Sequence, residues 1–192
     1  MAEVVVFHHA QGRTAGVLAF AEQLRGAGHI VHTPDLYDGR TFDTLDEGLA
    51  YCAQLGGMDE IQRRALRVQA ELPTEVVYAG MSLGVVPAQR LAQTVPGARG
   101  AIFLYSCLPT SFFGPWPAAV PVQVHGMDGD PFFADEGDLD AARALIDEAP
   151  HGELFLYPGD QHLFADSSLP AYDEPATELL TRRVLDFLRE PA

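Results

Sequence analysis

The sequence predicts an α/β fold with a mostly parallel sheet of six to seven strands and helices on both of its faces. Two observations carry this prediction. Six short runs rich in β-branched and aromatic residues alternate with helical patterns, and these runs are almost continuously apolar, as in strands buried on both faces. Strands joined by helices form right-handed crossover units, which build a parallel sheet. We expect one domain over residues 1–192.

The expected strands share an apolar run that is bounded by turn residues. They cover residues 4–8, 30–33, 76–79, 101–105, 120–124 and 154–157. The carboxyl ends of parallel strands meet at one edge of the sheet, where ligands bind in open α/β folds. Polar residues that follow these strands are therefore the candidates for a functional site.

The expected helices share apolar residues at intervals of three and four. They cover residues 15–25, 45–55, 59–72, 83–94 and 139–148, followed by a last helix with the apolar stripe Leu179, Leu180, Val184, Phe187 and Leu188. Glycine or proline ends most of them, and Asp138 is the expected N-cap of the helix over 139–148.

Composition excludes several kinds of chemistry. The net charge is −15, from 27 acidic and 12 basic residues, so we expect neither nucleic acid nor an anionic membrane as a partner. All twelve basic residues are arginine, which rules out Schiff-base lysines, P-loops and serine-lysine dyads. No apolar run is long enough to span a membrane, and the first run begins at Glu3, which leaves no room for the basic segment and cleavage site of a signal peptide. A cytoplasmic location is therefore expected. Cys52 and Cys107 are expected to be buried free thiols.

The strongest motif is Gly80-Met81-Ser82-Leu83-Gly84, which lies between an expected strand and an expected helix. This is the G-x-S-x-G pattern of a nucleophile elbow in the context that the elbow requires. A chain with 18 glycines can match the pattern by chance, as a simple turn before a helix. Because acid and histidine candidates follow later strands in the order Ser, Asp, His, we interpret Ser82 as the nucleophile.

Two later loops supply the partners of Ser82. Asp128 and Asp130 follow the expected strand over 120–124, and His162 follows the last strand. We predict His162 as the general base and Asp130 as its orienter, because the proline after Asp130 restricts its backbone to an extended conformation. Asp128 remains the alternative, and the other aspartate of the pair is then a turn residue.

Further site residues are assigned from their place after the strands. His8 and His9 point to opposite faces of their strand and cannot easily share a metal ion, so no metal site is expected. The backbone amides of Ala10 and Leu83 are the predicted oxyanion donors. The candidate substrate contacts are the side chains of His9, Arg40, Phe112 and Trp116.

Across about residues 4–188 the chain resembles the dienelactone hydrolase family of α/β-hydrolases. The resemblance rests on Pro34-Asp35-Leu36-Tyr37, the elbow at Ser82, the aspartate before Pro131-Phe132-Phe133, and Tyr157-Pro158-Gly159 leading to His162. It implies an α/β-hydrolase fold without a lid domain and ester or lactone hydrolysis without a cofactor. The best-known members have a cysteine in place of Ser82 and a glutamate in place of His9, so the resemblance implies a serine esterase here.

The residues and the resemblance together predict a serine hydrolase that cleaves a small carboxylic ester, lactone or thioester through an acyl-enzyme. The expected partner is this small substrate, and the protein is expected to be a monomer or homodimer. The alternative is a catalytically idle module that keeps the fold for ligand binding or interaction. Transfer of the acyl group to an acceptor other than water, the natural substrate and its leaving group stay open.

Overall fold

The computed structural model describes residues 1–189, and within this range six strands form one parallel sheet in the order β2-β1-β3-β4-β5-β6. The strands are β1 (Glu3–Phe7), β2 (Ile30–His32), β3 (Val77–Met81), β4 (Gly100–Leu104), β5 (Val122–Met127) and β6 (Gly152–Tyr157). Every pairing is parallel. The predicted α/β fold with a mostly parallel sheet is confirmed.

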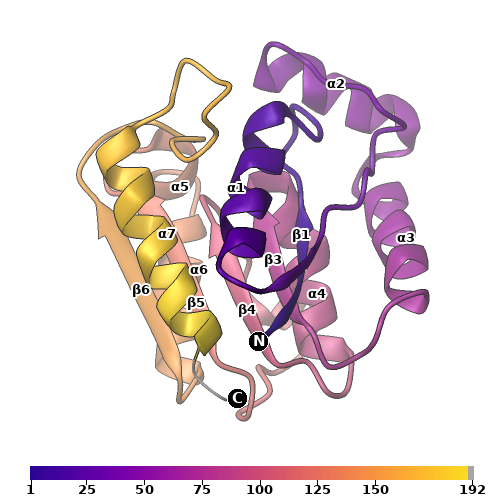
Figure 1. Cartoon of the computed structure of the whole chain (residues 1–192), viewed down its shortest axis with the longest axis vertical. Coiled ribbons are helices and arrows are strands. Elements are labelled where there is room, and N and C mark those ends of the chain that lie inside the picture. Colours follow the sequence, from indigo (N-terminus) through magenta and orange to yellow (C-terminus); the bar gives the residue numbers. More distant parts are fainter. Residues whose placement is uncertain (190–192) are drawn as a thin grey trace.

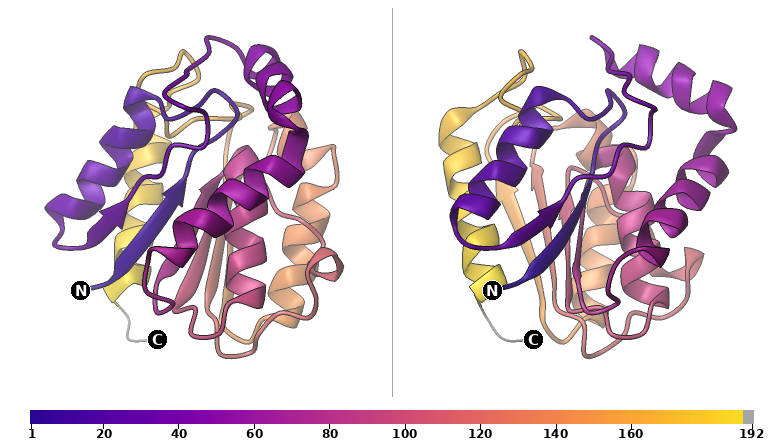
Figure 2. Two further views of the ribbon diagram at one scale, coloured as in Figure 1. Left: turned by 90° about the vertical axis from the view of Figure 1, so that its right-hand side faces the viewer. Right: turned by 45° about the vertical axis from the view of Figure 1, so that its right-hand side comes forward.

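Helices cover both faces of the sheet, as Figures 1 and 2 show. The seven α-helices of the described range are α1 (Ala15–Gly26), α2 (Leu45–Leu55), α3 (Gly57–Ala70), α4 (Val85–Thr94), α5 (Pro131–Ala134), α6 (Asp138–Glu148) and α7 (Glu174–Arg189). Two 3-10 turns, η1 (Ser82–Gly84) and η2 (Thr110–Phe112), follow β3 and β4. α1 and α7 lie on one face, while α3, α4 and α6 lie on the other.

Each face of the sheet has its own hydrophobic core. Val4, Val6 and Ile102 point to the side of α1 and α7, where they meet Phe20 and Val184. The alternate residues of the same strands pack against α3, α4 and α6. This alternation explains the continuous apolar runs of the sequence, because both sides of each central strand are buried. Cys52 and Cys107 are buried free thiols, as predicted.

Several element boundaries differ from the prediction. β5 begins at Val122 and continues to Met127, because its pairing with β6 extends as far as Met127 opposite Tyr157. α6 begins at Asp138, but its N-cap is Gly137 and Asp138 makes no capping bond. The Asp138 carboxylate instead accepts hydrogen bonds from Ser106 Oγ at 2.6 Å and the Cys107 N–H at 3.2 Å. It therefore ties α6 to the loop after β4.

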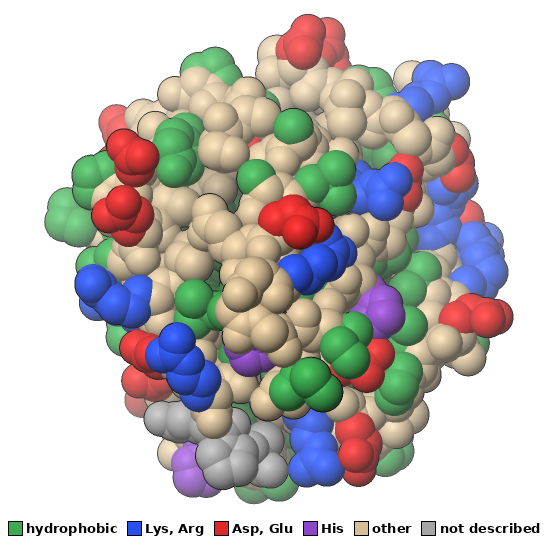
Figure 3. Space-filling model, in the orientation of Figure 1, with side chains coloured by type: hydrophobic (Ala, Val, Ile, Leu, Met, Phe, Trp, Pro, Cys, Tyr) green, Lys and Arg blue, Asp and Glu red, His purple; other side chains and the backbone are tan. Residues whose placement is uncertain are grey.

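The outer surface mixes both signs of charge. On the face shown in Figure 3, acidic and basic side chains are interspersed. Several ion pairs join residues three apart on one helix, such as Arg25 with Glu22 and Arg143 with Asp140. Exposed pairs of this kind contribute little to stability. None of the helices described in residues 1–189 is long and apolar enough to cross a membrane.

Three histidines, His8, His9 and His125, are buried completely inside this fold. His8 donates from Nδ1 to the His9 carbonyl at 2.8 Å and accepts the Leu36 N–H at Nε2, which attaches the loop after β2 to the end of β1. His125 bonds the Tyr157 hydroxyl at 2.9 Å and Gln123 Oε1 at 3.1 Å. Burial lowers the pKa of His8 to about 4 and the pKa of His125 to about 3. Both rings are therefore neutral in the folded state at neutral pH.

These two pKa values predict a stability that falls with acidification. Below the unfolded-state histidine pKa of about 6.5, the unfolded chain binds two protons that the folded chain excludes. The free energy of unfolding should be unaffected by these groups above pH 6.5. As the pH drops toward 4, His8 and His125 together should lower the free energy of unfolding by roughly 2.7 kcal/mol per pH unit. Urea unfolding at a series of pH values measures this slope.

The control for this prediction is a pair of single variants. His125→Gln should reduce the slope between pH 6 and 5 by up to about 1.4 kcal/mol per pH unit, since one linked proton is removed. His151→Gln, at an exposed position, should leave the slope unchanged. Equal slopes in the native protein and His125→Gln would contradict the assignment.

Candidate active site

The elbow at Ser82 forms where β3 leaves the sheet. Ser82 has a φ of 49°, a left-handed conformation that is rare for residues other than glycine. The turn is tight because a Cβ on Gly80 would lie 2.4 Å from the Gly84 carbonyl oxygen. A Cβ on Gly84 would lie 2.3 Å from the Phe7 carbonyl oxygen. Glycine at both positions therefore lets the serine turn outward while the elbow packs against the end of β1.

A hydrogen-bonded chain joins Ser82, His162 and Asp130. Ser82 Oγ lies 2.8 Å from His162 Nε2, and His162 Nδ1 lies 2.6 Å from Asp130 Oδ2. The carboxylate can only accept, so Nδ1 carries the proton and Nε2 accepts from the serine hydroxyl. This is the tautomer that a general base next to a nucleophilic serine requires.

The backbone around Asp130 fixes its carboxylate. Asp130 is fully buried and is the N-cap of α5, with Oδ1 accepting the Phe132 N–H at 3.0 Å. Its ψ of 113° is extended, as a residue before proline favours. Asp128 is exposed, and its carboxylate accepts the Gly159 N–H at 3.2 Å. The structure thus brings Asp130 to His162 and leaves Asp128 in the turn.

Aromatic side chains surround the His162 ring. The Phe132 ring centroid lies 4.8 Å and the Tyr105 ring centroid 5.8 Å from that of His162. Phe132 is 41% exposed, so it borders both the histidine and solvent. The Tyr105 hydroxyl accepts the Ala165 N–H at 3.1 Å, and burial raises the pKa of Tyr105. Tyr105 thereby holds the segment after His162 against the end of β4.

The two predicted oxyanion donors lie on adjoining segments. Leu83 follows Ser82 in η1, and Ala10 follows β1. Because a Cβ on Gly84 would also come within 2.7 Å of the His8 carbonyl oxygen, the loop that carries Ala10 is in direct contact with the elbow. Both residues are buried, and Gly48 of α2 packs on the Ala10 carbonyl.

The four predicted substrate contacts are not brought together. Arg40 is exposed, and its guanidinium lies 5.0 Å from the Tyr51 ring centroid. His9 is fully buried, with both ring nitrogens hydrogen bonded. It therefore has no free nitrogen for a substrate.

The prediction that Phe112 and Trp116 contact the substrate needs correction. Trp116 is a core residue that packs on Phe103 and donates to the Val120 carbonyl at 2.8 Å. Phe112 belongs to η2, whose Thr110 bonds Gln93 in the last turn of α4 and Glu148 at the end of α6. Because α4 runs away from the elbow, this segment lies at the far end of the helix from Ser82. The sequence shows which aromatic residues this loop carries, but not which of them are buried or the direction in which the loop runs.

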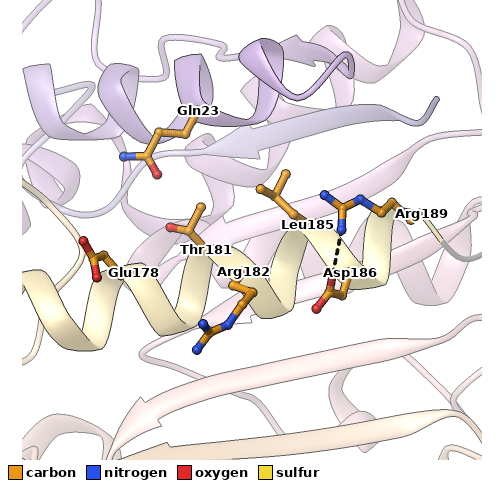
Figure 4. A pocket seen from close by; sticks show the side chains of 7 residues that line it. All are labelled: Gln23, Glu178, Thr181, Arg182, Leu185, Asp186 and Arg189. Carbon is orange, nitrogen blue, oxygen red and sulfur yellow. Dashed lines mark hydrogen bonds and ion pairs between the residues drawn. The ribbon is translucent and has the colours of Figure 1, made fainter.

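Two hollows that the described residues line lie away from Ser82. A cavity of about 280 Å³ between α1 and α7 is lined by Gln23 of α1 and six residues of α7 (Figure 4). Its Arg189 is paired with Asp186 at 2.8 Å. A larger cavity of about 1160 Å³ lies at the amino-terminal edge of the sheet, beside Glu3, Val77 and Gly152. Neither lining includes a residue of the hydrogen-bonded chain.

A parallel sheet with a serine elbow, a histidine after the last strand and an acid after the preceding strand defines an α/β-hydrolase. The sequence model of the dienelactone hydrolase family matches residues 1–191, and the chain belongs to this family. It is accordingly a carboxylic-ester hydrolase.

Solved structures of other proteins share the fold. A dienelactone hydrolase-like promiscuous phosphotriesterase from metagenomic libraries is 21% identical, with a TM-score of 0.73 over 98% of this chain and 85% of its own. A mouse protein that contains an α/β-hydrolase domain is 15% identical, with a TM-score of 0.69 over 96% and 88%. A cold-adapted esterase from an Arctic intertidal metagenomic library is 14% identical, with a TM-score of 0.67 over 98% and 83%. No protein among the curated sequences matches the chain.

The two aspartates of the loop after β5 provide a matched test of the site. Asp130→Asn should lower kcat by about 10³- to 10⁴-fold, because the amide can hold His162 in the wrong tautomer. Asp128→Asn should change kcat by less than about threefold, since its carboxylate only closes a turn. Steady-state hydrolysis of an activated ester by both variants is the measurement. A larger loss from Asp128→Asn than from Asp130→Asn would reverse the assignment.

Proposed function

We propose that the protein is a serine hydrolase that cleaves small carboxylic esters, lactones or thioesters through an acyl-enzyme. The single observation that carries this proposal is the continuous hydrogen-bonded chain from Ser82 Oγ through His162 to Asp130. The left-handed backbone at Ser82 supports it, because this conformation exposes the hydroxyl at the edge of the sheet.

In the proposed mechanism, Ser82 Oγ attacks the substrate carbonyl carbon while His162 Nε2 takes the hydroxyl proton. The developing oxyanion accepts hydrogen bonds from the N–H groups of Leu83 and Ala10. His162 then returns the proton to the leaving group as the tetrahedral intermediate collapses to the acyl-enzyme. Water, deprotonated by His162, releases the acid and restores Ser82. Asp130 keeps Nδ1 protonated and stabilises the imidazolium in both half-reactions.

The size of the substrate follows from what surrounds the nucleophile. The loops after β1, β3 and β5 are short, and no lid covers the carboxyl edge of the sheet in the described range. Phe132 is the large apolar side chain that is both solvent-exposed and packed on His162. Small substrates with an apolar group near the scissile bond fit this arrangement.

Hydrolysis of p-nitrophenyl esters of increasing acyl length tests the proposal. Ser82→Ala should lower kcat by at least about 10³-fold, because the nucleophile is lost. A fluorophosphonate probe should label the native protein and fail to label Ser82→Ala. Product analysis in the presence of alcohol or peroxide separates hydrolysis from acyl transfer, and a phosphotriester added to the panel tests the activity named for one structural neighbour.

The matched control is Ser111→Ala, at an exposed position on η2. It should keep native turnover and native labelling. Saturable ligand binding without any Ser82-dependent turnover would instead favour the alternative of a catalytically idle binding module.

A further inference from the structure

His9 closes a small turn directly after β1. Its Nδ1 accepts the Gln11 N–H at 3.2 Å, and its carbonyl accepts the Gly12 N–H at 3.0 Å. A side chain that accepts the N–H two residues ahead is the arrangement of an Asx turn, with an imidazole nitrogen in place of an asparagine oxygen. Both hydrogen bonds close around Ala10, which follows His9 in the chain and whose N–H is a proposed oxyanion donor.

The other ring nitrogen of His9 is attached to the loop that carries His162. His9 Nε2 lies 2.8 Å from Asp166 Oδ2, and both side chains are buried. Asp166 Oδ2 also accepts from the Thr14 hydroxyl. Asp166 Oδ1 accepts from the Ser168 N–H at 2.9 Å and the Ser168 hydroxyl at 2.6 Å. These donors and the imidazole together lower the pKa of Asp166 to about 2 against the opposing effect of burial.

Glycine at position 16 makes room for this carboxylate. A Cβ there would lie 1.7 Å from Asp166 Oδ1, so no other residue fits without moving the aspartate. The first turn of α1 is thus shaped around Asp166.

The hydrogen-bond partners of His9 determine its tautomer. Asp166 is an acceptor, so Nε2 must carry a proton. The Gln11 N–H is a donor, so Nδ1 must be free of one. Only the Nε2–H tautomer satisfies both neighbours. In that tautomer the ring links the Ala10 turn to the segment four residues beyond His162.

We propose that His9 is a positioning residue that aims the Ala10 N–H at the oxyanion, with Asp166 holding the ring in the required tautomer. This inference rests on the proposed function and deepens it. It replaces the predicted role of His9 as a substrate contact. The oxyanion exists only in the transition state and its neighbouring intermediates, so misplacing the donor should lower kcat and leave KM nearly unchanged.

Two single variants separate positioning from simple stabilisation. In His9→Asn, the amide oxygen occupies roughly the place of Nδ1 and can still accept the Gln11 N–H, but the side chain is too short to reach Asp166. In His9→Gln, the amide nitrogen reaches the place of Nε2 and can still donate to Asp166, but no acceptor remains for Gln11. Losing the buried bond to Asp166 should make His9→Asn the less stable variant.

The proposal predicts opposite orders for stability and turnover. We expect His9→Gln to lose about 10- to 100-fold in kcat, with KM within about threefold, and His9→Asn to keep kcat within about fivefold. Urea unfolding should nevertheless rank His9→Gln as the more stable of the two. If kcat follows stability instead, or if His9→Gln has native kcat, the positioning role is wrong.

A second measurement decides the case even if His9→Asn fails to fold. A thionoester places a sulfur, a weaker hydrogen-bond acceptor, where the oxyanion forms. If His9 aims an oxyanion donor, the ratio of oxoester to thionoester turnover should be several-fold smaller in His9→Gln than in the native protein. An unchanged ratio would overturn the proposal.

Ser82→Ala in the same assay keeps the two proposals distinguishable. Ser82-dependent turnover with an unaffected His9→Gln variant removes only the role of His9. Absence of Ser82-dependent turnover in the native protein removes both.

Discussion

The parallel pairing of the sheet is the constraint on which the site depends. Pairing aligns Phe7 with Gly80 and Met81 with Leu104, so the chain leaves β1, β3 and β4 at nearly the same level. β2 lies on one side of β1 and β3 on the other, which makes the gap between β1 and β3 the point where the strand order reverses. The loop with Ala10 and the elbow with Ser82 emerge on either side of that gap. The proposed nucleophile and the proposed oxyanion donors therefore converge because of strand order.

At the carboxyl edge of the sheet, each buried carboxylate accepts hydrogen bonds from nearby donors on both of its oxygens. The carboxylate of Asp130 is fully buried, with one oxygen on His162 and the other on a backbone N–H. Asp166, in the neighbouring cluster, is surrounded in the same way. A buried carboxylate whose two oxygens both accept hydrogen bonds is held in place, which is what an orienting group requires. These hydrogen bonds also fix the tautomer of each attached imidazole.

The fold and the elbow could be predicted because they depend on local patterns. Continuous apolar runs indicate a buried parallel sheet, and Gly80, Ser82 and Gly84 encode a turn within five residues. The bond between His9 and Asp166 spans 157 positions, so no local pattern reveals it. The same limit applies to the segment that carries Phe112 and Trp116, because no local pattern shows that Trp116 packs in the core while Phe112 is exposed. The short helix α5, which the sequence pattern did not predict, turns Phe132 outward and leaves Phe133 buried beneath the aspartate loop.

Two left-handed residues lie side by side at this edge, Ser82 after β3 and Tyr105 after β4. Each holds a conformation that costs a non-glycine residue about 1–3 kcal/mol. Glycine at position 82 would relieve that strain and lose the hydroxyl for which the strain is tolerated, whereas glycine at position 105 would also empty the buried site of an aromatic ring. At position 82 the residue that the backbone favours is consequently not the one that the proposed chemistry needs, and selection for stability alone would remove the hydroxyl from the elbow.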